Sequence, residues 1–419
     1  MLGRDPSIIK EVRARFAHVE TCPFAGERVF FENAGGALTL NSVVETSAKF
    51  AAIPDNQGRD NEASKALDAI IAKAREDAKT FLNAKGGQII LGESGTEMMA
   101  RVISAAIMAA PEGGQVLGST MEHPASSSPA QKWAKITGKT YAAAVHDNAA
   151  GMVTADAYSA KVTPDTRVAT ILHGSPVSGM GMDIAAISAA IREVAPDCYI
   201  VVDGIQHAAH GHVDVDAYGI DGYVVSPYKM FSRHGYGLAW VSERLGKHPL
   251  NNLIGGPEDR WELGTRDTGA YATFSDVIDY FVWLGERVGG SGDKRALIDA
   301  AAKAIHAHEK DLTDAIINGV GNQPGLKDMP KVSILAGEDN PAREGLVSLT
   351  VNDMDSAEVV SALRERGILV HARKADHYSG PVLRPLGLDS CVRVSLCHYN
   401  TEAEVAAFLA AMREIATQA

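Results

Sequence analysis

The sequence contains few cysteines, and they form no recognisable framework. Cys22, Cys198, Cys391 and Cys397 are its four cysteines in 419 residues, and no two of them make a CxxC pair. Isolated cysteines of this kind are mostly small buried apolar residues. This usage argues against a disulfide-stabilised secreted domain, so we expect reduced thiols and a cytoplasmic location.

Long apolar runs and an excess of basic residues are also missing. No stretch is apolar enough to span a bilayer, and the N-terminal segment lacks a signal-peptide core and predicts a short polar helix instead. The formal net charge of −12 argues against nonspecific binding to nucleic acid or to an anionic membrane. There is no Walker loop and no complete dinucleotide fingerprint. A local basic pocket that binds a small anion remains compatible with the negative net charge.

Apolar residues are plentiful enough for a large core. With 46% hydrophobic and 22% charged residues, the composition is that of an ordinary globular protein, and the length allows one large and one smaller domain. Helical and extended patterns alternate through the first two thirds of the chain, which predicts an α/β fold with a mainly parallel sheet between helices. The clearest predicted helices are 64–84 and 183–195, and the clearest predicted strands are 167–176, 198–206 and 221–227.

The pattern changes near residue 280. A long predicted helix over 293–317 is followed by a loop-rich stretch and then by a further alternation of strands and helices. We therefore predict a large domain over 24–280 and a smaller C-terminal α/β domain over 281–419. The N-terminal segment 1–23 is expected to pack on the smaller domain.

Two charged residues directly follow predicted buried strands. Asp203 comes after the apolar run 200–202, and Lys229 follows the run 222–225 after a short turn. Ligand sites of parallel α/β sheets lie beyond the carboxyl ends of the strands. A single strand–loop unit separates the two residues, so the acid and the amine could face one crevice. Taken alone, Asp203 could equally cap the following turn.

Two further signals are weak when taken singly. Ser94, Gly95 and Thr96 stand immediately before a predicted helix, where backbone N–H groups and small hydroxyl side chains can bind a phosphate. Ser94 with Glu97 also fits an ordinary capping box. His123 lies in a loop, where a histidine is usually solvated, although an imidazole can also stack on an aromatic cofactor.

Pyridoxal phosphate explains these four signals together. The amine of Lys229 would form an internal aldimine with the aldehyde of the cofactor. Asp203 would pair with the pyridinium nitrogen, so that the ring can act as an electron sink. The phosphate would lie at the helix N-terminus beside Gly95, and His123 would stack on the ring.

The segment 201–241, which contains "SPYK", resembles the core motif of the class V aminotransferases, a fold-type I group. Further similarity lies in "RWELGT" at 260–265 and "VRVSLCHYNTEAE" at 392–404, and the cysteine desulfurase-like branch matches best. The resemblance runs from about Phe31 to the C-terminus. It implies a seven-stranded, mainly parallel sheet with a smaller C-terminal domain, pyridoxal phosphate as cofactor, and a homodimer with shared active sites.

The resemblance also implies a role for individual residues. Lys229 would be the catalytic lysine, and His123 would stack on the ring and assist catalysis. The remaining cofactor contacts would come from Gly95, Thr96, Asp203, Gln206, Ser226, Tyr228 and, reaching the neighbouring subunit's cofactor, Thr265. Arg393 would bind the substrate carboxylate through a bidentate pair, with Asn33 as a second substrate contact. No residue is assigned to a metal.

Departures from the family pattern bear on the reaction. Desulfurases carry a mobile cysteine in the loop that here reads "HARKADHYSGPVLRPLG" (371–387), where Tyr378 stands about in place of the thiol. Tyr228 replaces the usual histidine before the lysine, and Pro176 stands where relatives often have asparagine. We hypothesise that the polar and basic residues of this loop bind a second anionic or polar group of the substrate. They are His371, Arg373, Lys374, His377 and Tyr378.

The sequence therefore predicts a pyridoxal phosphate enzyme that acts on a small amino acid without a desulfurase cysteine, as an aminotransferase or as a Cα/Cβ lyase. Epimerisation on the same scaffold is an alternative. A metal-dependent hydrolase is another, because His207, His210 and His212 form a cluster in which the last two could share one strand face. A pseudoenzyme that binds the cofactor is the third, against which the presence of Lys229, Asp203 and Arg393 argues.

Overall fold

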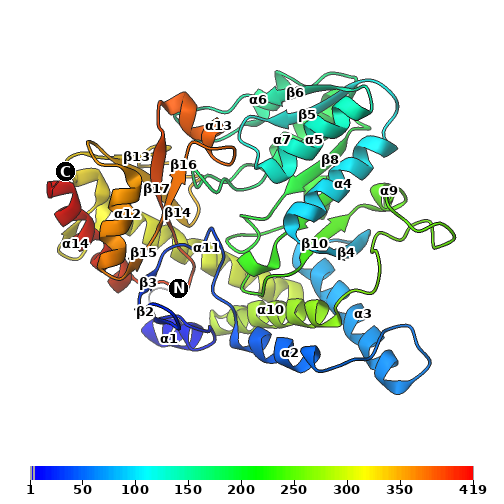
Figure 1. Cartoon of the computed structure of the whole chain (residues 1–419), viewed down its shortest axis with the longest axis horizontal. Helices are drawn as coiled ribbons and strands as arrows, with labels where there is room; N and C mark the ends of the chain where they lie inside the picture. The colour runs from blue at the N-terminus through cyan, green and yellow to red at the C-terminus, as the bar shows by residue number, and fades with distance from the viewer. Residues whose placement is uncertain (1, 3–4, 419) are drawn as a thin grey trace.

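A seven-stranded sheet forms the centre of the larger part of the chain in a computed structural model that describes residue 2 and residues 5–418 (Figure 1). Its strand order is β4-β10-β9-β8-β7-β5-β6, and only β10 runs antiparallel to its neighbours. The strands are β4 (Gln88–Gly92), β5 (Gln115–Ser119), β6 (Thr140–Ala144), β7 (Thr166–Leu172), β8 (Tyr199–Asp203), β9 (Gly222–Val225) and β10 (Gly237–Val241). The predicted α/β fold with a mainly parallel, seven-stranded sheet is confirmed.

Helices cover both faces of this sheet because its strands are apolar on both sides. In β8, Val201 packs into the hydrophobic cluster of the face covered by α4 and α5, whereas Ile200 and Val202 belong to the cluster that contains residues of α3, α7 and α10. The helices are α3 (Glu62–Leu82), α4 (Gly95–Ala109), α5 (Pro124–Ile136), α7 (Ile184–Val194) and α10 (Thr268–Arg287).

A second sheet, antiparallel throughout, forms the smaller part of the chain in the order β13-β14-β17-β16. One face is apolar: Val392 and Val394 of β17 pack in a cluster with residues of the helices α11, α12 and α14. The other face carries Arg393 and turns toward the larger sheet, as the hydrogen bond from its guanidinium to the carbonyl oxygen of Pro176 shows. The elements are α11 (Lys294–Asn318), β13 (Val332–Ile334), β14 (Leu346–Val351), α12 (Ser356–Glu365), β16 (His371–Lys374), β17 (Ser390–Ser395) and α14 (Glu402–Gln418).

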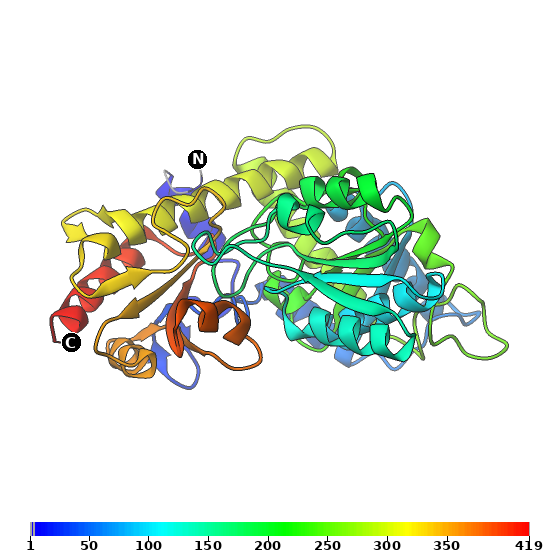
Figure 2. The same ribbon diagram turned by 90° about the horizontal axis from the view of Figure 1, so that it is seen from above.

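The long helix α11 connects the two parts, and it runs along both of them in Figure 2. The N-terminal helix α1 (Pro6–Arg13) contacts both: Ile8 and Val12 join the cluster of the larger sheet, while Arg13 donates to Glu404 of α14. The predicted division into 24–280 and 281–419 stays a prediction, and residue 280 lies inside α10. Within the described residues, no helix has both the length and the apolar character needed to cross a membrane.

Short elements complete the described chain. Two-residue strands form three small pairs, of which β3 with β15 is parallel and the other two are antiparallel. These elements are β1 (Thr21–Cys22), β2 (Gly26–Glu27), β3 (Val29–Phe30), α2 (Asn41–Ala51), α6 (Ala155–Ser159), α8 (Val215–Tyr218), α9 (Glu243–Gly246), β11 (Gly319–Val320), β12 (Gln323–Pro324), β15 (Ile368–Leu369) and α13 (Gly380–Leu383).

Candidate active site

Lys229 and Asp203 lie at the carboxyl ends of two neighbouring parallel strands. Asp203 is the last residue of β8 and pairs with Val224 of β9. Lys229 ends the short 3₁₀ turn Pro227–Lys229 that follows β9. The two charges are close enough for each to act on the pKa of the other, although no ion pair joins them. The sequence placed both groups at strand ends, and the fold brings those ends together.

The amine of Lys229 has few polar partners. Its Nζ donates one long hydrogen bond of 3.4 Å to Oε1 of Gln206. The pKa of this amine is lowered to about 8, mainly by burial and also by the nearby guanidinium of Arg393, while Asp203 acts in the opposite direction. A substantial fraction of Lys229 is therefore neutral, and hence nucleophilic, near physiological pH.

The carboxyl group of Asp203 is buried, with 2% of the residue exposed. Its Oδ1 accepts a hydrogen bond of 3.1 Å from the backbone N–H of Ile205. Burial raises the pKa of Asp203 to about 6, while the Ile205 hydrogen bond and the charge of Lys229 oppose that rise. A buried acid that is only partly satisfied by the chain is suited to a cationic ring nitrogen.

The N-terminus of α4 forms a tight cradle with Ser226. Ser94 caps the helix and its Oγ accepts from the N–H of Glu97 at 3.1 Å, which is half of the capping box, whereas the Glu97 carboxylate accepts from the N–H of Glu93 at 3.2 Å. A Cβ added to Gly95 would lie 2.0 Å from Oγ of Ser226, and one added to Gly237 would lie 2.5 Å from the nitrogen of Gly95. The absence of side chains at both glycines keeps the backbone N–H groups and the Ser226 hydroxyl together, as a phosphate site requires.

Replacing Gly95 by alanine is expected to weaken pyridoxal phosphate binding at least about tenfold, because the new methyl group collides with Ser226 and shifts the helix N-terminus. Titrating the apoprotein with cofactor and following absorbance measures the effect. Ser226→Ala is the matched variant, since it removes the hydroxyl without adding volume. Unchanged affinity in Gly95→Ala would contradict the placement of the phosphate here.

His123 lies close to the same site and is expected to be uncharged. It caps α5, and its Nδ1 accepts a hydrogen bond of 3.1 Å from the N–H of Ala125, which leaves the hydrogen on Nε2. The pKa of His123 is lowered to about 4, mainly by burial and also by the charges of Lys229 and Arg373. A neutral imidazole can stack on a cationic ring without charge repulsion. The ring of Tyr378 lies 5.3 Å from that of His123, centroid to centroid.

Arg393 reaches the site from the smaller sheet. Only 3% of the residue is exposed, its Nη1 donates to the carbonyl oxygen of Pro176 at 3.2 Å, and its Nε has no hydrogen-bond partner among the residues that the structure describes. Burial and the like charge of Arg373 lower the pKa of Arg393 to about 10. A buried guanidinium without an acidic partner requires an anion, and the α-carboxylate of an amino acid meets this need.

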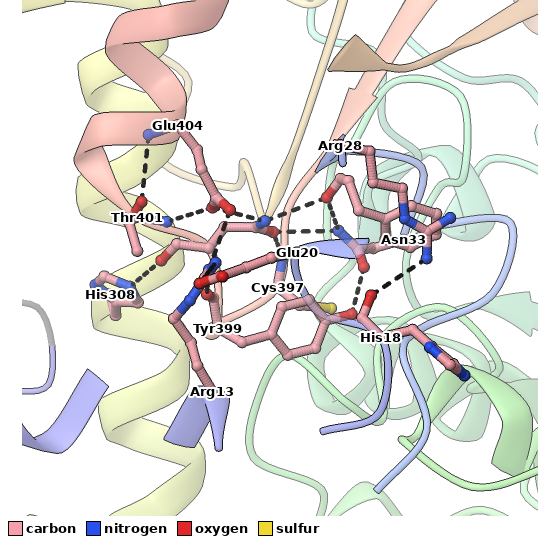
Figure 3. Close-up of polar contacts among 12 residues, drawn as sticks. Arg13, His18, Glu20, Arg28, Asn33, His308, Cys397, Tyr399, Thr401 and Glu404 are labelled. Atoms are coloured by element: carbon pink, nitrogen blue, oxygen red, sulfur yellow. Dashed lines mark hydrogen bonds and ion pairs between the residues drawn. The ribbon is translucent and has the colours of Figure 1, made fainter. Parts of the chain in front are cut away.

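Asn33 lies in a network of hydrogen bonds that joins the N-terminal loops to β17 and α14 (Figure 3). Its Nδ2 donates to the carbonyl oxygen of Ser395 at 2.8 Å and to Oδ1 of Asn400 at 3.2 Å, and its Oδ1 accepts from the hydroxyl of Tyr399. The partners of its amide all belong to the described chain. The predicted contact with substrate stays a prediction.

Three other predicted cofactor residues lie at or near the surface of a single chain. Thr96 and Thr265 are exposed, and Thr265 adjoins Arg266, which pairs with Glu93 beside the cradle at 2.5 Å. The ring of Tyr228 stacks on that of His234 at 4.3 Å. Their contacts with the cofactor stay predictions.

The histidine cluster that the hydrolase alternative requires does not form. Residues 205–210 are turns rather than a strand, so His210 and His212 share no strand face. His207 contacts Glu344 at 2.5 Å, His210 contacts Glu309 at 2.7 Å, and His212 contacts Asp299 at 2.9 Å. Within residues 2 and 5–418, the one group of potential metal ligands combines His210 with Glu309 and Cys397. The hydrolase alternative therefore loses the arrangement on which it rested.

Glu122 is a site neighbour that the sequence did not point to. It is buried, and its carboxyl accepts from the hydroxyl groups of Ser126 and Thr170, the latter at 2.6 Å. Burial raises the pKa of Glu122 to about 7, and Asp203 adds to the rise. The only available signal was its position directly before His123.

These residues fit pyridoxal phosphate on their own geometry. Lys229 offers an amine of lowered pKa, Asp203 a buried acid without a cation in ion-pair distance, and Gly95 with Ser226 a cradle that a Cβ would fill. Arg393 adds a buried cation with an unpartnered Nε.

Comparisons with known proteins identify the family of the chain. The sequence model of the family described as "Aminotransferase class-V" matches residues 29–408. The aminotransferase-like protein FGM3 of Gibberella zeae is 26% identical over 435 residues, which cover 97% of this chain and 98% of that protein. A probable cysteine desulfurase of Xylella fastidiosa (strain 9a5c) is 26% identical over 412 residues, covering 92% of this chain and 90% of that protein.

Solved structures show the same fold. The apo structure of a cysteine desulfurase from Thermococcus onnurineus NA1 superposes with a TM-score of 0.83 at 21% sequence identity, and the alignment covers 98% of each chain. The chain therefore belongs to the class-V aminotransferase family and is an enzyme of fold type I that depends on pyridoxal phosphate.

Proposed function

We propose that this enzyme transforms a small amino acid, as an aminotransferase or as a lyase acting at Cα or Cβ, with Lys229 as the residue that holds the cofactor. The observation that carries the proposal is the placement of Lys229 and Asp203 at adjoining strand ends, where each charge acts on the other. An epimerase that uses the same residues is the alternative. All three reactions begin by moving the α proton and differ only in the step that follows.

Each chain residue has one task in this proposal. The amine of Lys229 removes the α proton of the substrate and returns it, and a pKa near 8 suits that work at neutral pH. Arg393 binds the α-carboxylate and so orients the Cα–H bond. Asp203 keeps the ring nitrogen protonated, and the bound cofactor then serves as the electron sink.

We also propose that the enzyme does not form a persulfide on a loop cysteine. The loop 375–379 contains no cysteine, and the ring of Tyr378 occupies the position near His123. Cys391 is fully buried, and burial raises the pKa of its thiol to about 11, which disfavours the reactive thiolate. Sulfane sulfur bound to the protein after incubation with L-cysteine would contradict this part of the proposal.

A product assay tests the reaction type. Incubating the holoenzyme with a panel of amino acids and analysing for keto acid, ammonia, sulfide and change of chirality separates transamination, elimination and epimerisation. Keto acid that forms only with an acceptor keto acid indicates transamination, and keto acid with free ammonia indicates a lyase. If no amino acid gives a product or alters the cofactor absorbance, the proposal fails.

The lowered pKa of Lys229 predicts how the apoprotein captures its cofactor. The neutral amine is the nucleophile, and a group with a pKa of about 8 becomes neutral as pH rises through 8. The capture rate should therefore rise about tenfold between pH 7 and pH 9 and then level off, whereas an ordinary lysine with a pKa of about 10.4 gives about 100-fold without levelling.

Stopped-flow absorbance measures this rate. Nα-acetyl-lysine under the same buffers is the control, because it removes the contribution of the ionisation of the cofactor itself. A profile for the apoprotein that runs parallel to that of the free amine would contradict the lowered pKa.

We propose a homodimer in which Thr265 reaches the cofactor phosphate of the other subunit. The exposure of Thr265 and its position beside the Arg266–Glu93 ion pair, next to the cradle, support this proposal. Sedimentation equilibrium of the holoenzyme tests it, and a monomer would contradict it. The cytoplasmic location stays a prediction.

A further inference from the structure

Two arginines lie on the same face of the smaller sheet. In the antiparallel pair of β16 and β17, His371 is opposite Arg393 and Arg373 is opposite Cys391. Arg373 and Arg393 are therefore diagonal neighbours on one face, a relation that places such residues about 7–8 Å apart. This is the face that meets the larger sheet, since Arg393 donates to the carbonyl oxygen of Pro176.

Neither arginine has an acidic partner. The guanidinium of Arg393 donates to the carbonyl oxygen of Pro176, and the Nε of Arg373 donates to Oγ of Ser379 at 2.8 Å. No ion pair involves either guanidinium within the part of the chain that the structure describes.

The acids nearest to the two arginines have partners of their own. Glu32 pairs with His371 at 3.1 Å, and Asp376 accepts from the backbone N–H groups of Tyr378 and Ser379 at 2.8 and 3.1 Å. The positive charge of Arg373 and Arg393 is therefore left without a counter-ion at ion-pair distance.

Both guanidinium groups also lie near the reacting centre. Each lowers the pKa of Lys229, and Arg373 in addition lowers the pKa of His123. Arg373 is half-buried, so its charge is only partly hydrated. Two desolvated cations beside a third are unfavourable unless anions compensate them, and one α-carboxylate can pair with only one guanidinium in a bidentate manner.

Resting on the proposed function, we infer that the substrate is an α-amino acid whose side chain ends in a second anionic group. Arg393 binds the α-carboxylate, and Arg373 binds the acid group of the side chain. A neutral amino acid offers Arg373 no anion at ion-pair distance, and Asp376 acts on its charge only from farther away. Lys374, which the sequence hypothesis grouped with Arg373, lies on the opposite face of β16 and is exposed, so it takes no part.

Spectroscopic titration of the holoenzyme tests the inference with the isosteric pair L-aspartate and L-asparagine. In the wild type, aspartate should alter the cofactor absorbance at a concentration about 10–100-fold lower than asparagine does. Arg373→Ala should abolish that preference while moving the midpoint for L-alanine less than about threefold. Lys374→Ala, one residue away, should behave as the wild type. Titrating the wild type with L-glutamate and O-phospho-L-serine then shows which anionic side chain binds best.

Calorimetry with maleate, a dianion without an amine, provides a readout that needs no chemistry on the cofactor. Maleate should bind the wild-type holoenzyme at least about tenfold more tightly than acetate. The difference should vanish in Arg373→Ala and return in part in Arg373→Lys, with all variants keeping the thermal midpoint of the wild type.

Two outcomes overturn the inference alone: equal responses to aspartate and asparagine in the wild type, or an Arg373→Ala variant that weakens alanine and aspartate alike. If no amino acid changes the absorbance but maleate still binds through Arg373, the anion site stands and the proposed function fails.

Discussion

Replacing Lys229 by alanine is expected to reduce kcat at least about 1,000-fold with every substrate that the wild type accepts. The variant loses the amine that holds the cofactor and, with it, the group that moves the α proton. Among the described residues, Lys229 is the one lysine whose charge acts on the pKa of Asp203, so we expect no second amine to take over. Steady-state kinetics with the substrate identified in the product assay measure the loss.

Two control variants show whether the loss of activity comes from the missing amine or from the missing positive charge. Lys229→Arg keeps a cation beside Asp203 but offers no nucleophilic amine at working pH, so it should be as inactive as the alanine variant. Lys374→Ala removes an exposed lysine and should keep full activity. Borohydride treatment of the wild-type holoenzyme, followed by peptide mapping, should attach the cofactor to Lys229. Attachment at another lysine would overturn the assignment.

Replacing Asp203 by asparagine is expected to lower kcat about 100-fold or more. The change is isosteric but removes the negative charge that keeps the ring nitrogen protonated, and an opposite charge at such a distance shifts a pKa by about 1–3 units. Asp203→Glu should lose less, because it keeps the charge and changes only its position. Activity of Asp203→Asn within about threefold of the wild type would show that this carboxyl does not contact the ring.

The same substitution should stabilise the apoprotein, which a purely structural carboxyl would not do. Burial raises the pKa of Asp203 from an ordinary value of about 3.9 to about 6, so the ionised group costs the folded state up to about 3 kcal/mol. An acid with a raised pKa is destabilising above that pKa, and the cost disappears as pH falls below the value of the unfolded chain.

Urea unfolding of apo Asp203→Asn and apo wild type should therefore show a gain in the free energy of unfolding at pH 8. The gain should shrink toward zero near pH 4. Loss of stability at pH 8 would mean that the carboxylate is held by groups of the chain itself rather than left for a cofactor.

The sequence predicted the site best where a reactive side chain directly follows a buried strand. The apolar runs before Asp203 and Lys229 predicted buried strands, and β8 and β9 are such strands, side by side and parallel. Since the carboxyl ends of parallel strands meet at one edge of a sheet, the convergence of the acid and the amine followed from local pattern alone. The small residues at 94–96 likewise identified the start of α4.

Contacts between segments that are distant in the chain were harder to predict from the sequence. The antiparallel strand β10 lies between β4 and β9, and the residues of β10 alone do not predict that it runs antiparallel to them. The histidines at 207, 210 and 212 looked like one cluster because they are close in sequence, yet in the fold each meets a carboxylate of its own from a distant part of the chain: Glu344 for His207, and Glu309 and Asp299 of α11 for His210 and His212. A spacing of two residues predicts a shared face only in a strand, and this segment is a series of turns.

The sequence by itself determined the reacting groups: an amine and an acid at strand ends, a small-residue cradle and an arginine within an apolar strand. Only the tertiary structure decided how charge is distributed around them. The register of β16 against β17 turns Arg373 toward the site and Lys374 away, and it leaves Arg373 and Arg393 without acidic partners. Residue type and local periodicity can be read from the sequence. The desolvation of charged side chains and the contacts between charges from distant segments arise only when those segments pack together.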